Sequence, residues 1–254
     1  MSDGETLVLT VGQGDAARSI AVERRAGAGP TLVWLGGYRS DMSGTKAVAL
    51  DQSAAARGLG CVRFDYSGHG QSGGRFEDGT ISRWAEEARA VIDATTSGLV
   101  ILIGSSMGGW ISLLVAKALA GTDKVKAMVL IAPAPDFTRA LMWDRFSPED
   151  QATLKSIGRL ERPSAYSSEP NVVTYALIED GDRNQVLNAP IEIGCPVTIL
   201  QGMEDPDVPW RHALALVDRL PTANVTLTFI RDGDHRLSRP ADIDLLTEAV
   251  ARLL

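Results

Sequence analysis

The chain has 254 residues, of which 44% are hydrophobic and 22% charged, and its formal net charge at pH 7 is −7. This composition is typical of a globular protein large enough for one α/β domain with a sizeable core. The acidic balance and the lack of any basic run exclude a typical nucleic-acid binder and a partner of anionic membranes. Small molecules are therefore the expected partners.

The N-terminus and the cysteines bear on the cellular compartment. The first residues are acidic where a signal or transit peptide would be basic, and no apolar run approaches the length of a membrane span. Cys61 and Cys195 are too few for a disulfide framework and each opens a strand-like run, so we expect two buried thiols. A cytoplasmic location without a membrane span is the expectation.

The predicted elements begin with a hairpin and continue as alternating strands and helices. Residues 7–11 and 19–24 alternate enough to pair antiparallel at a sheet edge. Strands are predicted at 31–35, 61–66, 99–103, 126–132, 196–201 and 225–230, and helices at 42–57, 82–95, 107–120, 210–220 and 241–254. The strands after the hairpin are apolar on both faces, as in a parallel sheet covered by helices. The pattern predicts a doubly wound, mostly parallel α/β sheet.

The alternation breaks between Pro133 and Pro190. This interval contains several prolines and aromatic residues, and only short helical stretches such as 148–157. A long insertion between sheet strands is typical of a lid or a binding excursion. The alternative is a structural extension that covers a helix face. We expect one domain over residues 1–254, with a helical lid over about 133–190.

The segment Gly104-Ser105-Ser106-Met107-Gly108 lies between a strand-like run and a helix-like run. A Gly-x-Ser-x-Gly turn at such a junction strains the backbone of the serine and leaves no room for a Cβ at the two glycines. Ser106 is therefore the predicted nucleophile. A second match, Gly70-Gln71-Ser72-Gly73-Gly74, neither directly follows its strand nor opens an apolar helix, so we interpret Ser72 as a loop residue.

A serine hydroxyl needs a general base, and a histidine held by a carboxylate is the usual one. The chain has three histidines. His235 directly follows the last predicted strand, at the sheet edge where open α/β sheets bind their ligands. It also fits the hydrolase order of serine, acid and histidine. We predict His235 as the base and interpret His69 and His212 as solvated histidines without a catalytic role.

The acid is expected after the strand at 196–201, where the chain offers Glu204, Asp205 and Asp207. Asp205 is favoured because Pro206 and the following Val-Pro pair stiffen the turn that carries it. Glu204 has an extra methylene to place. Asp207 lies further along and remains an alternative.

Two backbone amides are candidate donors to the oxyanion of a tetrahedral intermediate. One is the N–H of Met107, at the N-terminus of the helix that follows the nucleophile. The other is the N–H of Tyr38, in the loop after the first parallel strand. Gly36 and Gly37 would allow the backbone of this loop to approach the substrate closely. Trp110 and Trp143, together with Tyr38, are candidate wall residues of the substrate site.

With these residues assigned, the chain resembles the α/β-hydrolase superfamily over its whole length. Several stretches resemble more narrowly the mitochondrial palmitoyl-protein thioesterases, which are also mycophenolic acid acyl-glucuronide esterases: residues 37–47, 63–68, 104–110, 205–210 and 234–236, with Pro163, Tyr166 and Ser167 in the insertion.

The resemblance implies a nucleophile at Ser106, an acid at Asp205, a base at His235, and activity on acyl esters or thioesters. Gly36-Gly37 stands where the superfamily commonly has His-Gly, so any bracing of the oxyanion loop by that histidine is absent.

The sequence thus predicts a serine hydrolase that cleaves carboxylic ester or thioester bonds through an acyl-enzyme on Ser106. The alternatives are a C–C bond hydrolase or a perhydrolase with the same three side chains, and a binding member of the fold without catalysis. No metal or cofactor is predicted, because the histidines are scattered without the spacing of metal ligands. The glycine-rich stretch 68–74 lacks the Gly-Lys-Ser/Thr ending of a phosphate-binding loop.

Overall fold

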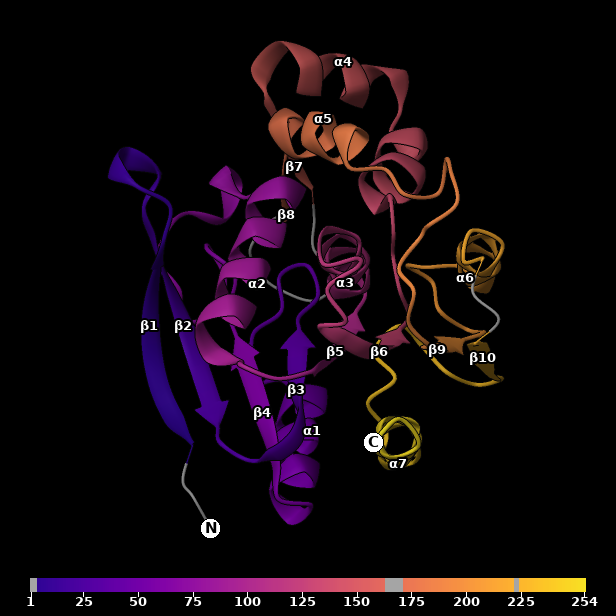
Figure 1. Ribbon diagram of the computed structural model, residues 1–254. Helices are drawn as coiled ribbons and strands as arrows, with labels where there is room; N and C mark the ends of the chain where they lie inside the picture. The colour runs from indigo at the N-terminus through magenta and orange to yellow at the C-terminus, as the bar shows by residue number, and fades with distance from the viewer. Residues whose placement is uncertain (1–3, 163–170, 222–223) are drawn as a thin grey trace.

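A computed structural model describes residues 4–162, 171–221 and 224–254, and Figure 1 shows their arrangement. Pro163, Tyr166 and Ser167 lie outside the described residues.

An eight-stranded sheet forms the centre of the molecule, with strand order β1-β2-β4-β3-β5-β6-β9-β10. The first two strands pair antiparallel, β2 pairs antiparallel with β4, and the other neighbours are parallel. This arrangement confirms the predicted mostly parallel sheet with an antiparallel N-terminal hairpin. The strands are β1 (Glu5–Val11), β2 (Arg18–Arg25), β3 (Ala28–Leu35), β4 (Leu59–Phe64), β5 (Val100–Ser105), β6 (Val125–Ile131), β9 (Val197–Gly202) and β10 (Val225–Ile230).

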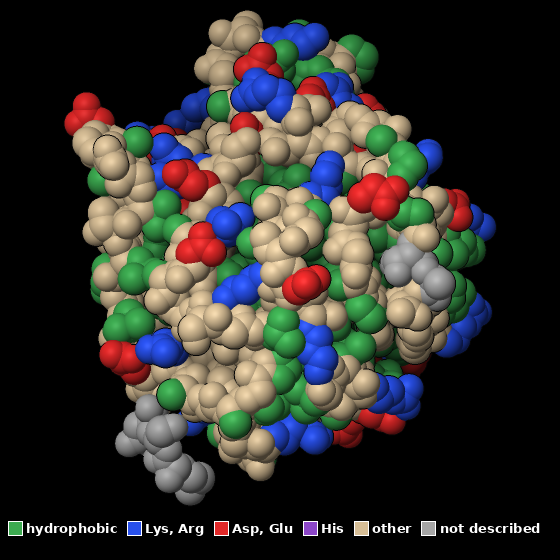
Figure 2. Space-filling model, in the orientation of Figure 1, with side chains coloured by type: hydrophobic (Ala, Val, Ile, Leu, Met, Phe, Trp, Pro, Cys, Tyr) green, Lys and Arg blue, Asp and Glu red, His purple; other side chains and the backbone are tan. Residues whose placement is uncertain are grey.

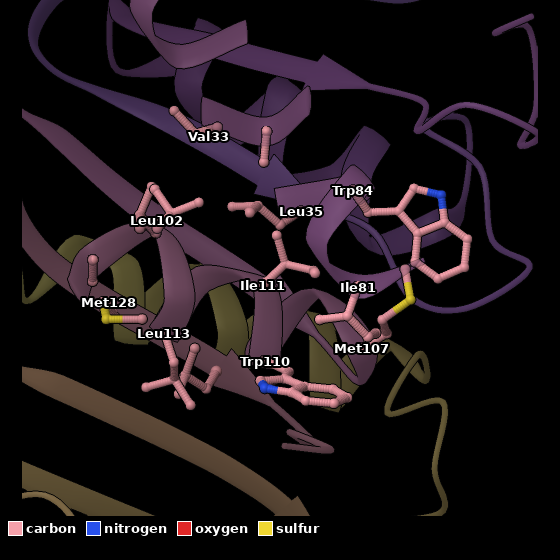
Figure 3. Close-up of a cluster of buried hydrophobic side chains, with 14 of the residues drawn as sticks. Val33, Leu35, Ile81, Trp84, Leu102, Met107, Trp110, Ile111, Leu113 and Met128 are labelled. Atoms are coloured by element: carbon pink, nitrogen blue, oxygen red, sulfur yellow. The ribbon is translucent and has the colours of Figure 1, made fainter. Parts of the chain in front are cut away.

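Helices cover both faces of the sheet, and each face has its own hydrophobic cluster. Successive side chains of a strand point to opposite faces, so Leu32 and Val33 of β3 belong to different clusters. Leu32 packs with Leu50 on one face, whereas Val33 lies in the cluster of Trp84 and Trp110, part of which Figure 3 shows. The first face carries α1 (Thr45–Ala56) and α7 (Pro240–Ala251), and the second carries α2 (Ile81–Thr95), α3 (Met107–Ala118) and α6 (Trp210–Val217).

Helix α1 begins at Thr45, whereas the sequence predicted a start at Met42. The side chain of Asp41 accepts the N–H of Ser43 at 2.8 Å, and the N–H of Met42 donates to Asp65 at 2.7 Å. An aspartate that binds a backbone amide two residues on forms a turn and competes with the helix. The chain therefore turns once before the helix starts.

The insertion contains more regular structure than the sequence predicted. Helix α4 (Pro148–Ile157) has the predicted bounds, whereas the antiparallel pair of β7 (Arg159–Arg162) and β8 (Asn171–Thr174) and the helix α5 (Tyr175–Arg183) were not predicted. Two short helical turns, η3 (Thr138–Met142) and η4 (Trp143–Arg145), precede α4. In Figure 1, α4 and α5 stand beyond the carboxyl ends of the central strands. This is the position of a lid, and the lid role stays a prediction.

The two ends of the insertion are tied together at Asp136. Its carboxylate accepts the N–H groups of Val186 and Leu187, each at 2.9 Å. A second tie joins the insertion to α2, because Asp180 accepts the N–H and the hydroxyl of Ser82 at 2.7 and 2.8 Å. The insertion is thus fastened to the sheet domain at its base.

Replacing Asp136 by Ala should loosen this base. One buried and one half-buried amide lose their acceptor, at roughly 1–3 kcal/mol for the buried one and less for the other. Alanine must also adopt the positive φ of 56° found at this position. We expect a lower urea midpoint and faster proteolysis between residues 138 and 183. The control is Asp182→Ala, which removes a half-buried ion pair with Arg139 and should cost about 1 kcal/mol or less. Equal proteolysis of the two variants would contradict the role of Asp136.

The predicted environment of the cysteines is confirmed. Cys61 and Cys195 are both buried, and burial raises the pKa of these thiols to about 12 and about 11. None of the described helices has the length and apolar character needed to cross a membrane. On the face shown in Figure 2, Lys and Arg side chains are interspersed with Asp and Glu.

Candidate active site

The turn between β5 and α3 holds Ser106 in a strained backbone conformation, with φ 54° and ψ −117°. Its N–H donates to the carbonyl of Ile131 in β6 at 2.9 Å, and its own carbonyl accepts the N–H groups of Gly109 and Ala134. Strain of this kind persists only where surrounding contacts fix it. The three backbone bonds hold the side chain of Ser106 at the carboxyl edge of the sheet.

The two glycines of the motif are required by packing against backbone atoms. A Cβ on Gly104 would clash with the carbonyl of Gly108, and a Cβ on Gly108 would clash with the carbonyl of Leu35 at the end of β3. The hydroxyl of Ser72, in the second motif match, instead donates to the carbonyl of Asp65 at 2.6 Å. The structure therefore places Ser72 in a loop contact, in keeping with its interpretation.

His235 connects Ser106 to Asp205. Its Nε2 lies 3.1 Å from Oγ of Ser106, and its Nδ1 lies 2.8 Å from Oδ2 of Asp205. The serine precedes α3, the aspartate follows β9 and the histidine follows β10. These three loops meet at the carboxyl ends of their strands, as expected for an open α/β sheet. The structure thus brings together the three side chains predicted as nucleophile, acid and base.

Asp205, rather than Asp207, holds the histidine. Its side chain is fully buried, and Oδ1 accepts the N–H groups of Asp207 and Val208 at 2.9 and 2.8 Å. Gln201 adds a bond from Nε2 to Oδ2 at 3.3 Å. A carboxylate at Nδ1 assigns the ring proton to that nitrogen, so Nε2 is left to accept the hydroxyl proton of Ser106.

Asp205, Asp207 and His235 also place one possible metal-ligand atom each within 4.8 Å of one another. The Nδ1 atom of His235 faces Asp205 at hydrogen-bond distance, and Oδ1 of Asp205 already accepts two amides. These bonds orient the imidazole of His235, and they occupy the nitrogen and oxygen atoms that would otherwise bind a metal ion. The absence of a metal cofactor stays a prediction.

The two predicted oxyanion donors flank Ser106. Met107 is the first residue of α3, and Tyr38 lies in the turn after β3. That turn touches the nucleophile, because a Cβ on Gly37 would lie 3.4 Å from Cβ of Ser106. Within the described part of the chain, neither the N–H of Met107 nor that of Tyr38 has a hydrogen-bond partner. Their role as oxyanion donors stays a prediction.

The side chain of Tyr38 is anchored by aromatic rings and by one hydrogen bond. Its ring packs against Phe76, Phe137 and Trp84, with ring centroids 4.9, 5.6 and 6.0 Å away. Its hydroxyl donates to the carbonyl of Val172 at 3.4 Å, and burial raises its pKa to about 12. The ring of Tyr38 is thus partly buried and packed against the hydrophobic core.

The tryptophans predicted as wall residues make packing contacts. Trp110 is fully buried, and its indole N–H donates to the carbonyl of Asn184 at 3.1 Å. Trp143 lies in the small cluster of the insertion, with the cations of Arg139 and Lys155 over its ring at 5.4 and 5.2 Å. These contacts favour packing over substrate contact for both rings.

A cavity of about 660 Å³ opens beside the turn after β3. Ser106, Asp205 and His235 are not among its lining residues, so this cavity lies next to the turn after β3 and does not contain Ser106. Its lining comes from that turn, from the loop after β4 and from the β7–β8 pair: Arg39, Ser40, Asp41, Gly68, His69, Gly70, Arg75, Phe76, Glu77, Arg159, Glu161 and Val172.

The other two histidines are hydrogen-bonded inside the protein. Nε2 of His212 lies 2.7 Å from the carbonyl of Pro135, and burial lowers the pKa of this ring. Nε2 of His69 accepts the N–H of Arg39 at 3.2 Å, and burial lowers its pKa to about 4. The interpretation of His69 as a solvated histidine was wrong, because its ring is buried and contacts the turn after β3. Nothing in the sequence indicates this contact, since His69 and Arg39 are far apart along the chain.

These lowered pKa values make folding sensitive to acid. Below the ordinary histidine pKa of 6.5, the unfolded chain binds protons that buried His69 and His212 do not, so stability falls as the pH drops from 6.5 through about 4. Above pH 6.5 both rings are neutral in the folded and in the unfolded protein, so the two histidines no longer make stability depend on pH. Urea midpoints between pH 7 and 4 should fall less steeply in the double variant His69→Gln, His212→Gln. Urea midpoints that fall equally steeply with pH in wild type and in the double variant would contradict the lowered pKa values of His69 and His212.

Comparison with known proteins gives consistent matches. The alpha/beta hydrolase family matches residues 27–244. The palmitoyl-protein thioesterase ABHD10, mitochondrial, of Homo sapiens is 34% identical over 93% of this chain and 76% of that protein. The crystal structure of a hydrolase candidate from Agrobacterium vitis S4 has 55% identity and a TM-score of 0.96 over 99% of both chains. The mouse alpha/beta hydrolase domain-containing protein 10 has 32% identity and a TM-score of 0.87, covering 97% of this chain and 98% of that chain.

The expected cytoplasmic location is contradicted by these relatives. The matching proteins of Homo sapiens, Pongo abelii and Mus musculus are each named as mitochondrial. The expectation rested on the acidic residues at the start of the sequence, and it was wrong to infer a compartment from them.

The fold and the sequence matches lead to one assignment. The sheet order, the strained serine between β5 and α3, and the family match over most of the chain agree with one another. The human relative exceeds 30% identity over nearly the whole sequence. The chain belongs to the alpha/beta hydrolase family.

Proposed function

We propose that this hydrolase cleaves carboxylic ester or thioester bonds through an acyl-enzyme on Ser106. The observation that carries the proposal is the continuous chain of hydrogen bonds from Asp205 through His235 to Ser106. The names of the relatives support an acyl thioester as one substrate class, because the human protein is named a palmitoyl-protein thioesterase.

The reaction proceeds in two halves. His235 takes the hydroxyl proton of Ser106 as Oγ attacks the acyl carbonyl carbon, and a tetrahedral oxyanion forms. Asp205 stabilises the imidazolium without accepting its proton. Nε2 of His235 then returns the proton to the departing alcohol or thiol, and the C–O or C–S bond breaks. Water, deprotonated by the same nitrogen, attacks the acyl-enzyme, and release of the carboxylic acid restores Ser106.

The oxyanion is stabilised by backbone amides in this scheme. The N–H of Met107 lies at the N-terminus of α3, where the helix dipole favours negative charge, and the N–H of Tyr38 comes from the facing turn. Removing one such donor from an enzyme typically lowers kcat by about 10²–10³. The fixed backbone at both positions provides this stabilisation without rearrangement during the reaction.

A fluorophosphonate probe tests the nucleophile directly. We expect covalent labelling of the wild-type protein on the peptide that contains Ser106, and no labelling of Ser106→Ala. Ser72→Ala is the matched control, because it removes the serine of the second motif and should leave labelling of Ser106 intact. Labelling of Ser106→Ala at wild-type level, or undiminished ester hydrolysis by that variant, would refute the proposal.

Specificity constants for an acyl series on oxygen and sulfur leaving groups then define the substrate class. A preference for sulfur with long acyl chains would support a thioesterase, and a preference for short oxygen esters would support a carboxylesterase. Labelling of Ser106 without turnover of any ester or thioester would favour the C–C hydrolase or perhydrolase alternative.

A further inference from the structure

The turn after β3 has a backbone conformation that needs outside support. The N–H of Ser40 donates to the carbonyl of Gly37 at 3.1 Å, which closes a four-residue turn. Arg39, the third residue of this turn, has a positive φ of 59°. This is the position in a type II turn where glycine or asparagine is favoured. An arginine there costs on the order of 1 kcal/mol or more, so another contact must hold the turn in this form.

His69 supplies that contact from the loop after β4. Its Nε2 accepts the N–H of Arg39 at 3.2 Å, and its Nδ1 lies 3.2 Å from the carbonyl of Ser67. A carbonyl can only accept, so the proton of the neutral ring is assigned to Nδ1 and Nε2 carries the lone pair. The ring therefore links the loop after β4 to the peptide between Tyr38 and Arg39.

The surroundings of His69 keep it neutral and fixed. The ring is only 4% exposed, and Phe76, Trp84 and Tyr66 surround it at centroid distances of 5.0, 5.3 and 5.8 Å. Burial lowers the pKa of His69 to about 4, and the nearby charge of Arg39 acts in the same direction. At neutral pH the lone pair on Nε2 is permanently available to the amide.

Tyr38 is consequently held at two points. Its ring packs against Phe76, one of the rings that also surround His69. The peptide that follows it is held by the bond to His69. The peptide that precedes it carries the N–H proposed as an oxyanion donor, and the carbonyl of this same peptide, that of Gly37, accepts the N–H of Ser40. The turn thus limits the rotation of this peptide. If the bond were lost, the peptide after Tyr38 could flip and give Arg39 an ordinary negative φ.

We propose that His69 is a positioning residue for ester or thioester hydrolysis: it holds the amide of Arg39 and thereby aims the N–H of Tyr38 at the forming oxyanion. His69 acts through the turn and contacts no reacting atom. The inference rests on the proposed function, because it assigns a role to one of the two oxyanion donors.

Three substitutions separate the acceptor atom from the packing of the ring. His69→Gln keeps an acceptor near the position of Nε2. His69→Phe fills the aromatic surroundings without an acceptor, and His69→Asn can still bind the carbonyl of Ser67 but is too short to reach Arg39. Melting temperatures identify which variants are folded, and His69→Asn replaces His69→Phe in the comparison if the latter does not fold.

The kinetic readout is a split between kcat and KM. In His69→Phe the N–H of Tyr38 should no longer point directly at the oxyanion, and kcat should fall about 10- to 100-fold. KM should stay within about twofold of wild type, because this donor acts mainly in the transition state. His69→Gln should retain kcat to within about fivefold, since the hydrogen bond is kept. The affinity of a trifluoromethyl ketone, which forms a tetrahedral adduct on serine, should fall in parallel with kcat.

Two further measurements distinguish a failure of the positioning role of His69 from a failure of the hydrolase proposal. Hydrogen exchange of the Arg39 amide should be slow in wild type and fast in His69→Phe, whether or not any ester is turned over. If the fluorophosphonate labels Ser106 but folded His69→Phe keeps wild-type kcat, or loses no more than His69→Gln, the positioning role is overturned and the hydrolase proposal stands. If the probe does not label Ser106, the hydrolase proposal fails and the role of His69 fails with it.

Discussion

Asp205→Asn should lower kcat by about 10⁴-fold while the protein stays folded and still binds substrate. Oδ1 of Asp205 accepts two backbone amides, so the oxygen of an asparagine must occupy that position. Its NH₂ group then faces Nδ1 of His235 in place of Oδ2. Two donors cannot face each other, so the imidazole must carry its proton on Nε2. The base would then present an N–H to Ser106 and could not accept the hydroxyl proton.

The matched control for this variant is Asp207→Asn. The backbone N–H of Asp207 donates to Asp205, and the substitution leaves that bond in place. Steady-state kinetics on one ester, with melting temperatures for both proteins, should show a large loss of kcat only in Asp205→Asn. A comparable loss in Asp207→Asn would show that the acid had been assigned to the wrong carboxylate.

Gly108→Ala should destabilise the protein by about 3 kcal/mol, the upper end of the usual cost of overpacking. The added Cβ would clash with the carbonyl groups of Leu35 and Gly36, which are backbone atoms that cannot turn aside as a side chain could. Relief requires β3 to move away from α3. Because β3 leads directly into the turn that carries Tyr38, the same movement should displace an oxyanion donor, so kcat falls together with stability.

Thermal unfolding measures the first effect, with an expected fall of roughly 6–12 °C in Tm at 2–4 °C per kcal/mol. Gly98→Ala is the control, because a Cβ at that position meets nothing within 4 Å and its φ is not positive. That variant should unfold within about 2 °C of wild type, as an unconstrained surface substitution does. An unchanged Tm in Gly108→Ala would mean that β3 and α3 are not in rigid contact.

The sequence was most informative where local chemistry dictates structure. Strands that are buried on both faces leave a continuous apolar pattern, which made the sheet predictable. Backbone contacts require glycine at positions 104 and 108, which made the turn at Ser106 recognisable. The stiff turn favoured Asp205 but left Asp207 open as an alternative, and the structure places Asp205 at Nδ1 of His235. In each case the residue types and their spacing leave a recognisable pattern in a short stretch of sequence.

The remaining features depend on contacts between distant segments. The pair β7–β8 has four residues in each strand, too few for a periodic pattern, and it forms by pairing across the insertion. The bond from Arg39 to His69 exists because β3 and β4 are adjacent and parallel, which brings the loops after them together. Adjacency could be expected, but which side chain reaches which amide is decided by the turn conformations.

The small cluster of Trp143, Leu154, Val173 and Ile178 gives the outer part of the insertion a core distinct from the two that flank the sheet. Substitutions there change the surface beyond the strand ends without repacking the layers that hold the nucleophile. Descendants of this chain can therefore diverge in the outer insertion while keeping their reaction chemistry. For protein engineering, the two sides of this cluster must be exchanged together, because Trp143 and Leu154 pack with Val173 and Ile178 and β7 pairs with β8. Asp136 is retained to close the base of the insertion.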